Sequence, residues 1–156
     1  MAGLPKLAVI VLLLVVAGSG CHATRSSRGD PAAVEKRLNE IFDAAAKKEL
    51  KRLDSYHLYG PRFSKFGAEP HRLDSEAARA GEHAGLTAVE NVQMRARDLK
   101  IDLFGSVAIA TFLMEVNFSS GGREGSSTAR GTLVFVHSDG EWKITHEHFS
   151  PVPEVK

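Results

Sequence analysis

Apolar residues recur every three or four positions in the segment after Asp30, and every second position from Val92 onward. A spacing of three and four places apolar side chains on one face of a helix. Asp30 followed by Pro31 is typical of a helix start, because Asp caps free backbone N–H groups and proline lacks one. We predict a helix from Pro31, with a continuation or a second helix around Leu50 and Leu53. The apolar positions of the first helix are Val34, Leu38, Ile41, Phe42 and Ala45.

The middle of the chain has a mixed pattern. Residues 56–66 (YHLYGPRFSKF) are rich in aromatic side chains and are interrupted by Gly60–Pro61, which stops a regular helix. Asp74–Ser75 then offers another helix cap, and we expect a weaker helix over residues 75–89.

The period of two from Val92 onward indicates strands. The apolar positions change parity after Arg97–Asp98, as they do at a β-bulge that bends a sheet. We expect a flexible connection at residues 119–127 and a tight hairpin turn at Asp139–Gly140. The predicted strands cover residues 92–103, 107–118, 128–137 and 141–149. Helices followed by strands that can all pair antiparallel indicate an α+β fold, with a helical layer on one face of a curved sheet.

The turn at Asp139–Gly140 predicts the pairing of the last two strands. One face would carry the pairs His137–Trp142, Phe135–Ile144, Leu133–His146 and Gly131–His148. The other face would carry Val136–Lys143, Val134–Thr145, Thr132–Glu147 and Arg130–Phe149. The first face has more large apolar area, so we assign it to the core, beside the apolar even-numbered positions of residues 108–118.

In this register His146 and His148 point into the core, and Gly131 leaves space opposite His148. Three interpretations stay open: satisfied wall residues, polar anchors or an acid–base pair in a ligand pocket, and metal ligands. We favour the first. Metal ligation has the least support, because a catalytic zinc typically needs three protein ligands and no third has a fixed spacing. The predicted pocket residues are Tyr56, Tyr59, Phe112, Met114, Leu133, Phe135, His146 and His148. We expect His57, His71 and His83 at the surface or in loops, and His137 beside Trp142.

Composition limits the classes of protein. The chain has 156 residues, 43% hydrophobic and 25% charged, which suits one globular domain, and its single cysteine, Cys21, excludes a disulfide scaffold. Lys6 is the only charge in the first 20 residues, so 19 basic and 19 acidic residues remain after them. A nucleic-acid-binding protein would usually have a basic excess, and we expect no nucleic-acid partner and no cofactor.

The amino-terminal segment predicts where the protein is located in the cell. Leu7–Ala17 is an apolar run that is too short to span a bilayer but fits a secretory signal. With Gly18–Gly20 and Cys21 after it, the segment resembles a bacterial lipoprotein signal, which implies a signal peptide at residues 1–20 and lipidation of Cys21. Residues 21–29 read as the lipidated cysteine and a linker. We expect a lipid-anchored protein of the cell envelope, with a soluble secreted or periplasmic protein as the alternative.

A second resemblance covers roughly residues 31–153. The chain ends in a motif with Gly140, Trp142, Lys143, Ile144, His146, His148 and Ser150, after the segments 57–67 and 98–112. This arrangement resembles the SnoaL-like branch of the nuclear transport factor 2-like superfamily, and we place that domain at residues 30–153, with 154–156 as a tail. The resemblance implies a cone-shaped α+β domain with a pocket between sheet and helices, which often dimerises through the sheet. Members include isomerases, cyclases and epoxide hydrolases, and many have no known reaction.

Enzymes of this family that abstract a carbon-bound proton generally use a carboxylate on an inner strand. The inner faces that we assign within residues 92–149 contain no Asp or Glu: Asp98 lies at the bulge, and Asp102, Glu115 and Glu147 have outer parity. We expect the helical carboxylates Asp54, Asp74 and Glu76 at the surface. We therefore favour a non-enzyme.

The leading hypothesis is an envelope-anchored domain that binds a small apolar ligand or a partner protein in its pocket. One alternative is an isomerase, cyclase or hydrolase that uses His148 as general base, with His146 or Tyr56 assisting. Another is a structural dimerisation module. The outer sheet face is too apolar for a free surface, so we expect a homodimer through Ile109, Thr111, Leu113, Val134 and Thr145.

Overall fold

The helices begin where the capping residues predict. The computed structural model describes residues 29–152, and the predicted signal peptide and Cys21 lie outside the described residues. The three helices are α1 (Pro31–Ala46), α2 (Leu50–Ser55) and α3 (Ser75–Thr87). The Asp30 side chain accepts a hydrogen bond from the backbone N–H of Ala32, and Asp74 accepts one from Ala77. Within residues 29–152, no helix is both long enough and apolar enough to span a membrane.

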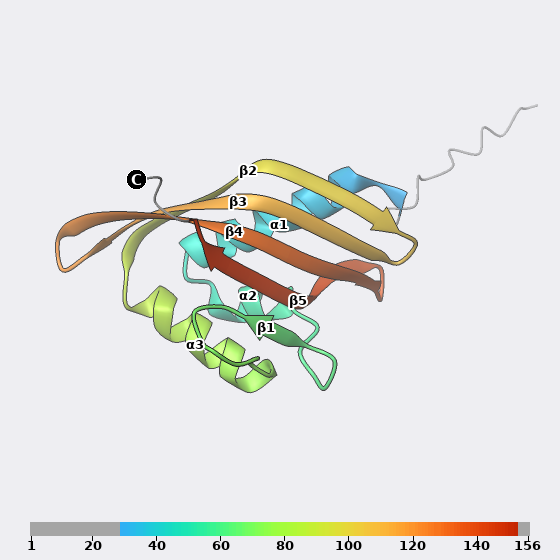
Figure 1. Ribbon diagram of the computed structural model, residues 1–156, viewed down its shortest axis with the longest axis horizontal. Helices are drawn as coiled ribbons and strands as arrows, with labels where there is room; N and C mark the ends of the chain where they lie inside the picture. Colours follow the sequence, from blue (N-terminus) through green and yellow to red (C-terminus); the bar gives the residue numbers. More distant parts are fainter. Residues whose placement is uncertain (1–28, 153–156) are drawn as a thin grey trace, which may run out of the picture.

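Five strands form one sheet in the order β1-β5-β4-β3-β2 (Figure 1). They are β1 (Ser64–Phe66), β2 (Glu90–Phe104), β3 (Val107–Ser120), β4 (Arg123–Ser138) and β5 (Glu141–Pro151). β2 to β5 pair antiparallel, as predicted, whereas β1 pairs parallel with β5. β1 lies in the aromatic segment for which the sequence predicts no regular element.

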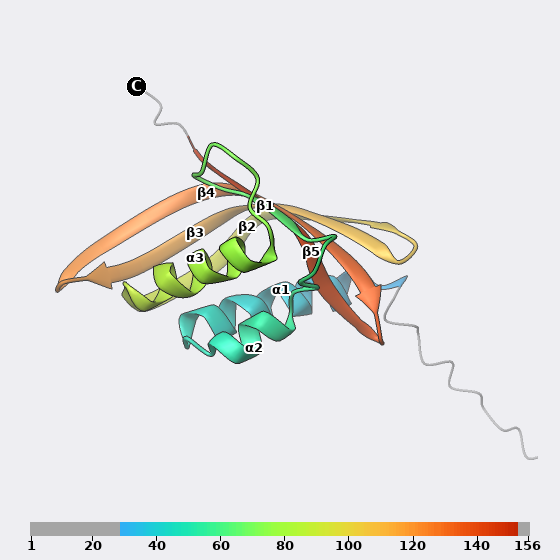
Figure 2. The same ribbon diagram turned by 90° about the horizontal axis from the view of Figure 1, so that it is seen from below.

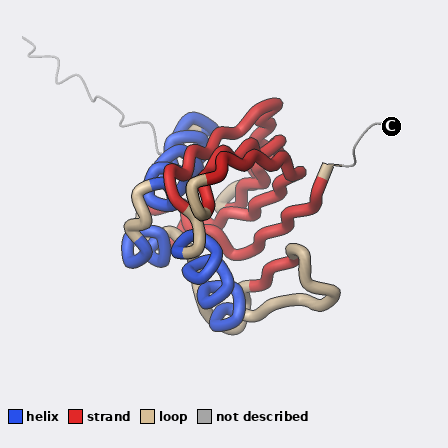
Figure 3. The backbone as a smooth tube through the Cα atoms, turned by 90° about the vertical axis from the view of Figure 1, so that its left-hand side faces the viewer, coloured by secondary structure: helices blue, strands red, loops and turns tan. Residues whose placement is uncertain are grey.

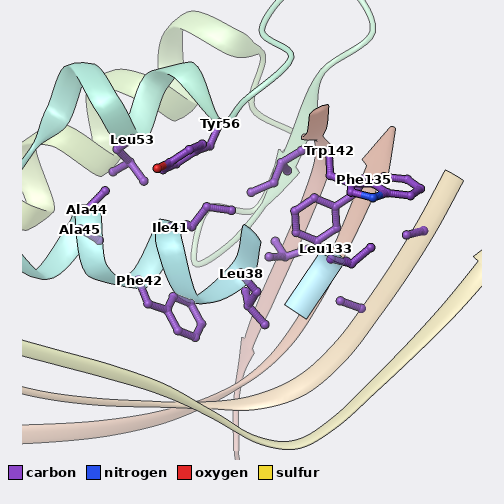
Figure 4. Close-up of a cluster of buried hydrophobic side chains, with 14 of the residues drawn as sticks. Leu38, Ile41, Phe42, Ala44, Ala45, Leu53, Tyr56, Leu133, Phe135 and Trp142 are labelled. Atoms are coloured by element: carbon purple, nitrogen blue, oxygen red, sulfur yellow. The ribbon is translucent and has the colours of Figure 1, made fainter. Parts of the chain in front are cut away.

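All three helices lie on the concave side of the sheet (Figure 2), which leaves the convex side uncovered by helices (Figure 3). The α1 face predicted from its apolar spacing packs against the sheet, and its side chains meet those of α2, β4 and β5 in the core (Figure 4). The largest fully buried side chains are Phe135, Leu38, Leu53, Leu133, Ile144 and Val34. This is the predicted α+β architecture.

The connection between β3 and β4 differs from the expected flexible segment. The two strands continue to a tight turn in which Gly121 and Gly122 have φ values of 56° and 76°. Glycine adopts such values without steric cost, so two residues reverse the chain. Phe118 covers Gly125 so closely that a Cβ at Gly125 would lie 2.8 Å from its ring. The prediction of a flexible connection at residues 119–127 is therefore wrong.

The predicted bulge in β2 is present: the register shifts between Arg97 and Lys100, and Asp98 has a φ of 50°. β2 has another register shift between Glu90 and Gln93, and β5 contains a bulge, neither of which the sequence predicted. Phe135 pairs with Ile144 as predicted, but Val134 pairs with His146, so Thr145 is an extra residue.

The bulge at Thr145 makes the predicted register wrong beyond Ile144. Leu133 pairs with Glu147 and Gly131 with Phe149, whereas Thr132 pairs with His148. Because side chains alternate along a strand, Glu147 and Phe149 point inward, and His146 and His148 point to the convex face. The space above Gly131 is filled by the rings of Phe112 and Phe149, whose nearest atoms lie 2.8 and 3.1 Å from the position of an added Cβ.

Candidate functional site

A cavity of about 370 Å³ lies between the helices and the sheet. Most of its walls are apolar, and its polar lining residues are Lys65, Glu82 and Glu147. A larger depression, of about 500 Å³, lies along the exposed face of α1, but side chains such as Glu35 and Lys36 keep it solvated. The apolar cavity is lined by Ile41, Phe42, Ala45, Leu53, Gly85, Leu86, Val89, Val92, Met94, Met114, Val116, Phe118, Leu133, Ile144 and Phe149.

The polar end of this cavity is built around Glu147, which is only 3% exposed to solvent. One carboxylate oxygen lies 2.9 Å from Nε2 of His57, and the other lies 2.7 Å from Nζ of Lys65. Lys65 reaches Glu147 because the two residues are partners in the parallel pairing of β1 with β5. His57 follows α2, and its segment bridges to Ile144 of β5. The three-residue strand β1 therefore places the Lys65 ammonium beside Glu147 of β5.

His57 is held in one orientation by two acceptors. Its Nδ1 lies 3.0 Å from the carbonyl oxygen of Leu53, which accepts a hydrogen bond, so Nδ1 carries a proton. Burial lowers the pKa of His57, but the hydrogen bond to Glu147 and the carboxylate charges outweigh it, and the pKa is raised. An imidazolium that donates from both ring nitrogens satisfies this geometry.

Glu147 and Lys65 titrate in opposite senses. Burial raises the pKa of Glu147, but the hydrogen bond from His57 and the charge of Lys65 dominate and hold the pKa well below its usual value. Burial lowers the pKa of Lys65, yet the nearby carboxylates raise it overall. Glu147 is therefore an anion between two cations, and the three side chains together carry one positive charge.

Glu82 completes the polar end from α3. It lies four residues after Ala78 and four before Leu86, both buried, so it shares the helix face that points to the core. Its carboxyl oxygen is 4.0 Å from Nε2 of His57, which is its nearest ion-pair partner in residues 29–152. Burial and the charge of Glu147 raise the pKa of Glu82, and Lys65 and His57 oppose this shift only in part. Glu82 is thus a carboxyl group at the cavity wall with no close donor among the described residues.

Aromatic residues close the far side of His57. The Tyr59 ring stacks on the imidazole with centroids 4.8 Å apart and planes at 6°, and Phe63 packs edge-on against both rings. The Tyr59 hydroxyl is buried and has no hydrogen-bond partner within the described part of the chain. Burial raises the pKa of Tyr59. These rings separate His57 from solvent, so the charges of the cluster act at low dielectric.

His57, Glu82 and Glu147 could together hold a metal ion, because one ligand atom from each lies within 4.8 Å of the others. One imidazole and two carboxylates are a suitable donor set for a divalent transition metal. However, Lys65 already supplies a cation to Glu147, and His57 would have to lose a proton whose pKa is raised. The side chains present therefore fit a proton-holding cluster better than a metal centre.

Comparison with known proteins shows the family. The model of the SnoaL-like domain matches residues 34–154. The chain belongs to the SnoaL-like domain family. No curated protein matches it.

Solved structures share the fold of this SnoaL-like domain. A candidate dehydratase of the NTF2-like family from Streptomyces avermitilis has 18% identity and a TM-score of 0.72, covering 79% of this chain and 96% of its own. A candidate calcium/calmodulin-dependent protein kinase II association domain from Xanthomonas campestris has 20% identity and a TM-score of 0.70, with 81% and 91% covered. The CaMKII hub from S. rosetta has 21% identity and a TM-score of 0.65, with 79% and 98% covered. The predicted NTF2-like fold is confirmed.

The SnoaL-like domain places the predicted pocket residues in several environments. Met114 and Leu133 line the cavity, whereas Phe112 and Phe135 are buried in the core beside it. The Tyr56 hydroxyl lies 2.7 Å from Nε of Arg52, and Arg37 covers the Tyr56 ring at 4.6 Å, so Tyr56 is directed away from the cavity.

His146 and His148 do not line the cavity, because the β5 bulge turns them outward. Nδ1 of His146 lies 2.9 Å from the Ser64 hydroxyl, and both imidazole rings pack edge-on against Phe66 at 6.3 Å. His148 is exposed to solvent. A role for His148 as general base in the cavity is therefore excluded by its position.

Sequence reasoning missed four residues of the site: His57, Lys65, Glu82 and Glu147. His57 was expected at the surface but is 5% exposed, and Glu147 was expected on the outer face but is buried. For Glu82 a signal was available, since Ala78, Glu82 and Leu86 are four apart on one helix face. For Glu147 the only signal was Phe149, an apolar residue out of phase with Trp142 and Ile144.

Proposed function

We propose that this SnoaL-like domain binds a small, largely apolar molecule in the 370 Å³ cavity, with the polar end of the ligand at Glu82 and Lys65. The observation that carries the proposal is the division of the cavity into apolar walls and one polar end. Ligand sites commonly combine apolar walls with a few polar groups that orient the ligand. The buried ion pairs of Glu147 make that polar end rigid.

A pair of matched variants tests this proposal. Gly85 lines the cavity and Gly81 does not, yet both lie on α3 with nothing within 4 Å of an added Cβ. We expect Gly85→Leu to weaken binding of an apolar fluorescent probe at least about tenfold, because the leucine would occupy ligand space. Gly81→Leu serves as the control with unchanged binding. Equal binding by both variants, or no probe binding by the original protein, would contradict the proposal.

A second candidate function is acid–base catalysis in the same cavity. Glu82 supports it, because a carboxyl group that has a raised pKa and no close donor within residues 29–152 can exchange a proton with a bound substrate. The absence of an inward carboxylate was the reason to favour a non-enzyme, and that reason no longer holds. Catalysis would require Glu82→Gln to abolish turnover while leaving ligand binding intact.

Self-association through the convex face is a further part of the proposed function. β3 presents Ile109, Thr111 and Leu113 there, and Val134 follows on β4. The solved association and hub domains that share the fold support this idea. It also includes the alternative in which the domain acts as a structural dimer. Thr145 contributes less than expected, since it is the bulge residue and its hydroxyl lies 3.4 Å from the Arg62 carbonyl.

We also propose that Cys21 is lipidated and anchors the domain at the cell envelope. The apolar run Leu7–Ala17 and the small residues before Cys21 support this proposal. Expression with a radiolabelled fatty acid tests it: the protein should be labelled and found with membranes, and Cys21→Ser should lose both properties. A labelled Cys21→Ser protein would contradict it, and an unlabelled soluble original protein would favour the secreted alternative.

A further inference from the structure

We propose that the cavity selects ligands with a carboxylate head group, and that Glu82 takes up a proton as the carboxylate binds. This inference rests on the proposed function, because it names the ligand class of the same cavity. It starts from the charges at the polar end, which are held by four side chains from four different segments.

The side chains of His57, Lys65 and Glu147 have one positive charge in excess. Glu147 contacts His57 at 2.9 Å and Lys65 at 2.7 Å, so one anion serves two cations. A buried positive charge without a partner is costly. In the empty cavity Glu82 is the nearest group that can supply the second negative charge, but it lies 4.0 Å from His57. A ligand anion that reaches Lys65 directly would balance the charge better.

The hydrogen-bond donors at the polar end match the acceptor oxygens of a carboxylate. An ammonium group has three N–H donors, and Glu147 is the one ion-pair partner of Lys65 in the part of the chain that is described. Lys65 lines the cavity, so its other N–H groups can donate to a ligand. A protonated Glu82 adds an O–H donor on the neighbouring wall. A carboxylate has two acceptor oxygens, one for each donor, and such charge-assisted hydrogen bonds are strong.

Binding of an anion favours the protonated form of Glu82. Burial and Glu147 already raise the pKa of Glu82, against the opposing charges of Lys65 from β1, of His57 after α2 and of its own neighbour His83. His83 is itself paired with Asp54 at 2.8 Å, and Tyr59 faces the group as a neutral phenol. A ligand anion beside Glu82 would raise its pKa further, because like charges disfavour a second ionised carboxyl. A free protein with ionised Glu82 must therefore gain a proton on binding.

A ligand cation fits poorly. An ammonium head group would lie beside Lys65 and His57, and only an ionised Glu82 could pair with it. A neutral amide would keep the hydrogen bond from Lys65 but would leave Glu82, 4.0 Å from His57, as the only second counter-charge among the four side chains of the polar end. The order of affinity expected for one apolar tail is carboxylate, then amide, then ammonium.

Isothermal titration calorimetry with octanoate, octanamide and octylammonium tests this order on the purified protein. We expect octanoate to bind at least about tenfold more tightly than octanamide, since a hydrogen bond to a charged group is about twice as strong as a neutral one. Titrations in two buffers of different ionisation enthalpy measure proton uptake, which should rise toward one proton per octanoate as the pH is raised into the range where Glu82 is ionised in the free protein. The affinity should then fall by up to about tenfold per pH unit.

Glu82→Gln is the decisive variant, because glutamine mimics the protonated carboxyl. It should bind octanoate without proton uptake and with no slope against pH. Glu76→Gln, an exposed position on the same helix, should keep the original uptake. Equal affinity for octanoate and octanamide, tighter binding of octylammonium, or unchanged uptake in Glu82→Gln would overturn the inference and leave the proposed cavity intact. Binding of none of the three probes would overturn the proposed function itself.

Discussion

Glu147 and Lys65 are partners across the parallel pairing of β5 with β1, and the Lys65 ammonium lies 2.7 Å from the Glu147 carboxylate. The pair forms because the bulge at Thr145 turns Glu147 inward. The short strand β1, which runs alongside β5 for three residues, then places Lys65 opposite Glu147. One local irregularity thus converts an apolar strand face into the polar end of a cavity.

Removing the Glu147 charge should destabilise the fold. Glu147→Gln would leave His57 and Lys65 as buried cations without their common anion, and breaking a buried ion pair in this way costs about 3–5 kcal/mol. Chemical denaturation measures the free energy of unfolding. Glu124→Gln, at an exposed position of β4, should change it by less than about 0.5 kcal/mol. A loss of similar size in both variants would contradict the role of Glu147.

The same cluster should give stability a maximum between pH 4.5 and 6.5, the ordinary pKa values of Glu and His. The pKa of Glu147 is lowered on folding, so its contribution is present above pH 4.5 and is lost as the pH falls. The pKa of His57 is raised, so its contribution is present below pH 6.5 and is lost as the pH rises. The raised pKa of Glu82 gives a contribution that is already lost as the pH rises above 4.5 toward the folded-state pKa, so it moves the maximum toward the acid end of this range.

Melting temperatures measured from acid to alkaline pH check this profile. Glu147→Gln should flatten the acid side, and Glu82→Gln should flatten part of the decline above pH 4.5. If both variants kept the profile of the original protein, other groups would control the pH dependence of stability.

The sequence predicted the elements whose side-chain pattern is local. The spacing of Val34, Leu38 and Ile41 determines one helix face, and the parity change after Arg97–Asp98 revealed the β2 bulge because apolar residues flank it on both sides. The sequence does not reveal the Thr145 bulge, because the residues from Ile144 to His148 include no apolar residue after Ile144 that would show a change of parity. The site then depends on β1, a three-residue strand whose pairing with β5 is made by distant residues.

Adding a methyl group at Gly131 should destabilise the sheet. A Cβ there would lie 2.8 Å from the Phe112 ring and 3.1 Å from the Phe149 ring, so the packed rings would have to move. Overpacking of this kind costs about 1–3 kcal/mol. Gly81→Ala is the control, since its Cβ meets open space and alanine favours a helix. Thermal unfolding should show a lower melting temperature for Gly131→Ala only, and an unchanged value would contradict the close packing.

Charge on the convex face should prevent self-association. Ile109 pairs with Val134 across β3 and β4, and Leu113 lies on the same face four residues further along β3. In this strip Ile109 has Val134 as its β4 neighbour, whereas Leu113 lies between Arg97 of β2 and Arg130 of β4. In a dimer formed through this strip, Leu113→Lys would add a cation between Arg97 and Arg130, and Ile109→Lys would bring a charge into the interface beside Asp102. Both changes oppose assembly, the first more strongly. Sedimentation should show a dimer for the original protein and a monomer for Ile109→Lys and Leu113→Lys. Glu35→Lys, on the exposed face of α1, changes the charge by two units on the helical side, against one unit in each strip variant, and should stay dimeric. A dimer that persists in both strip variants would place the contact on another surface, and a monomeric original protein would remove the convex face as an interface between copies.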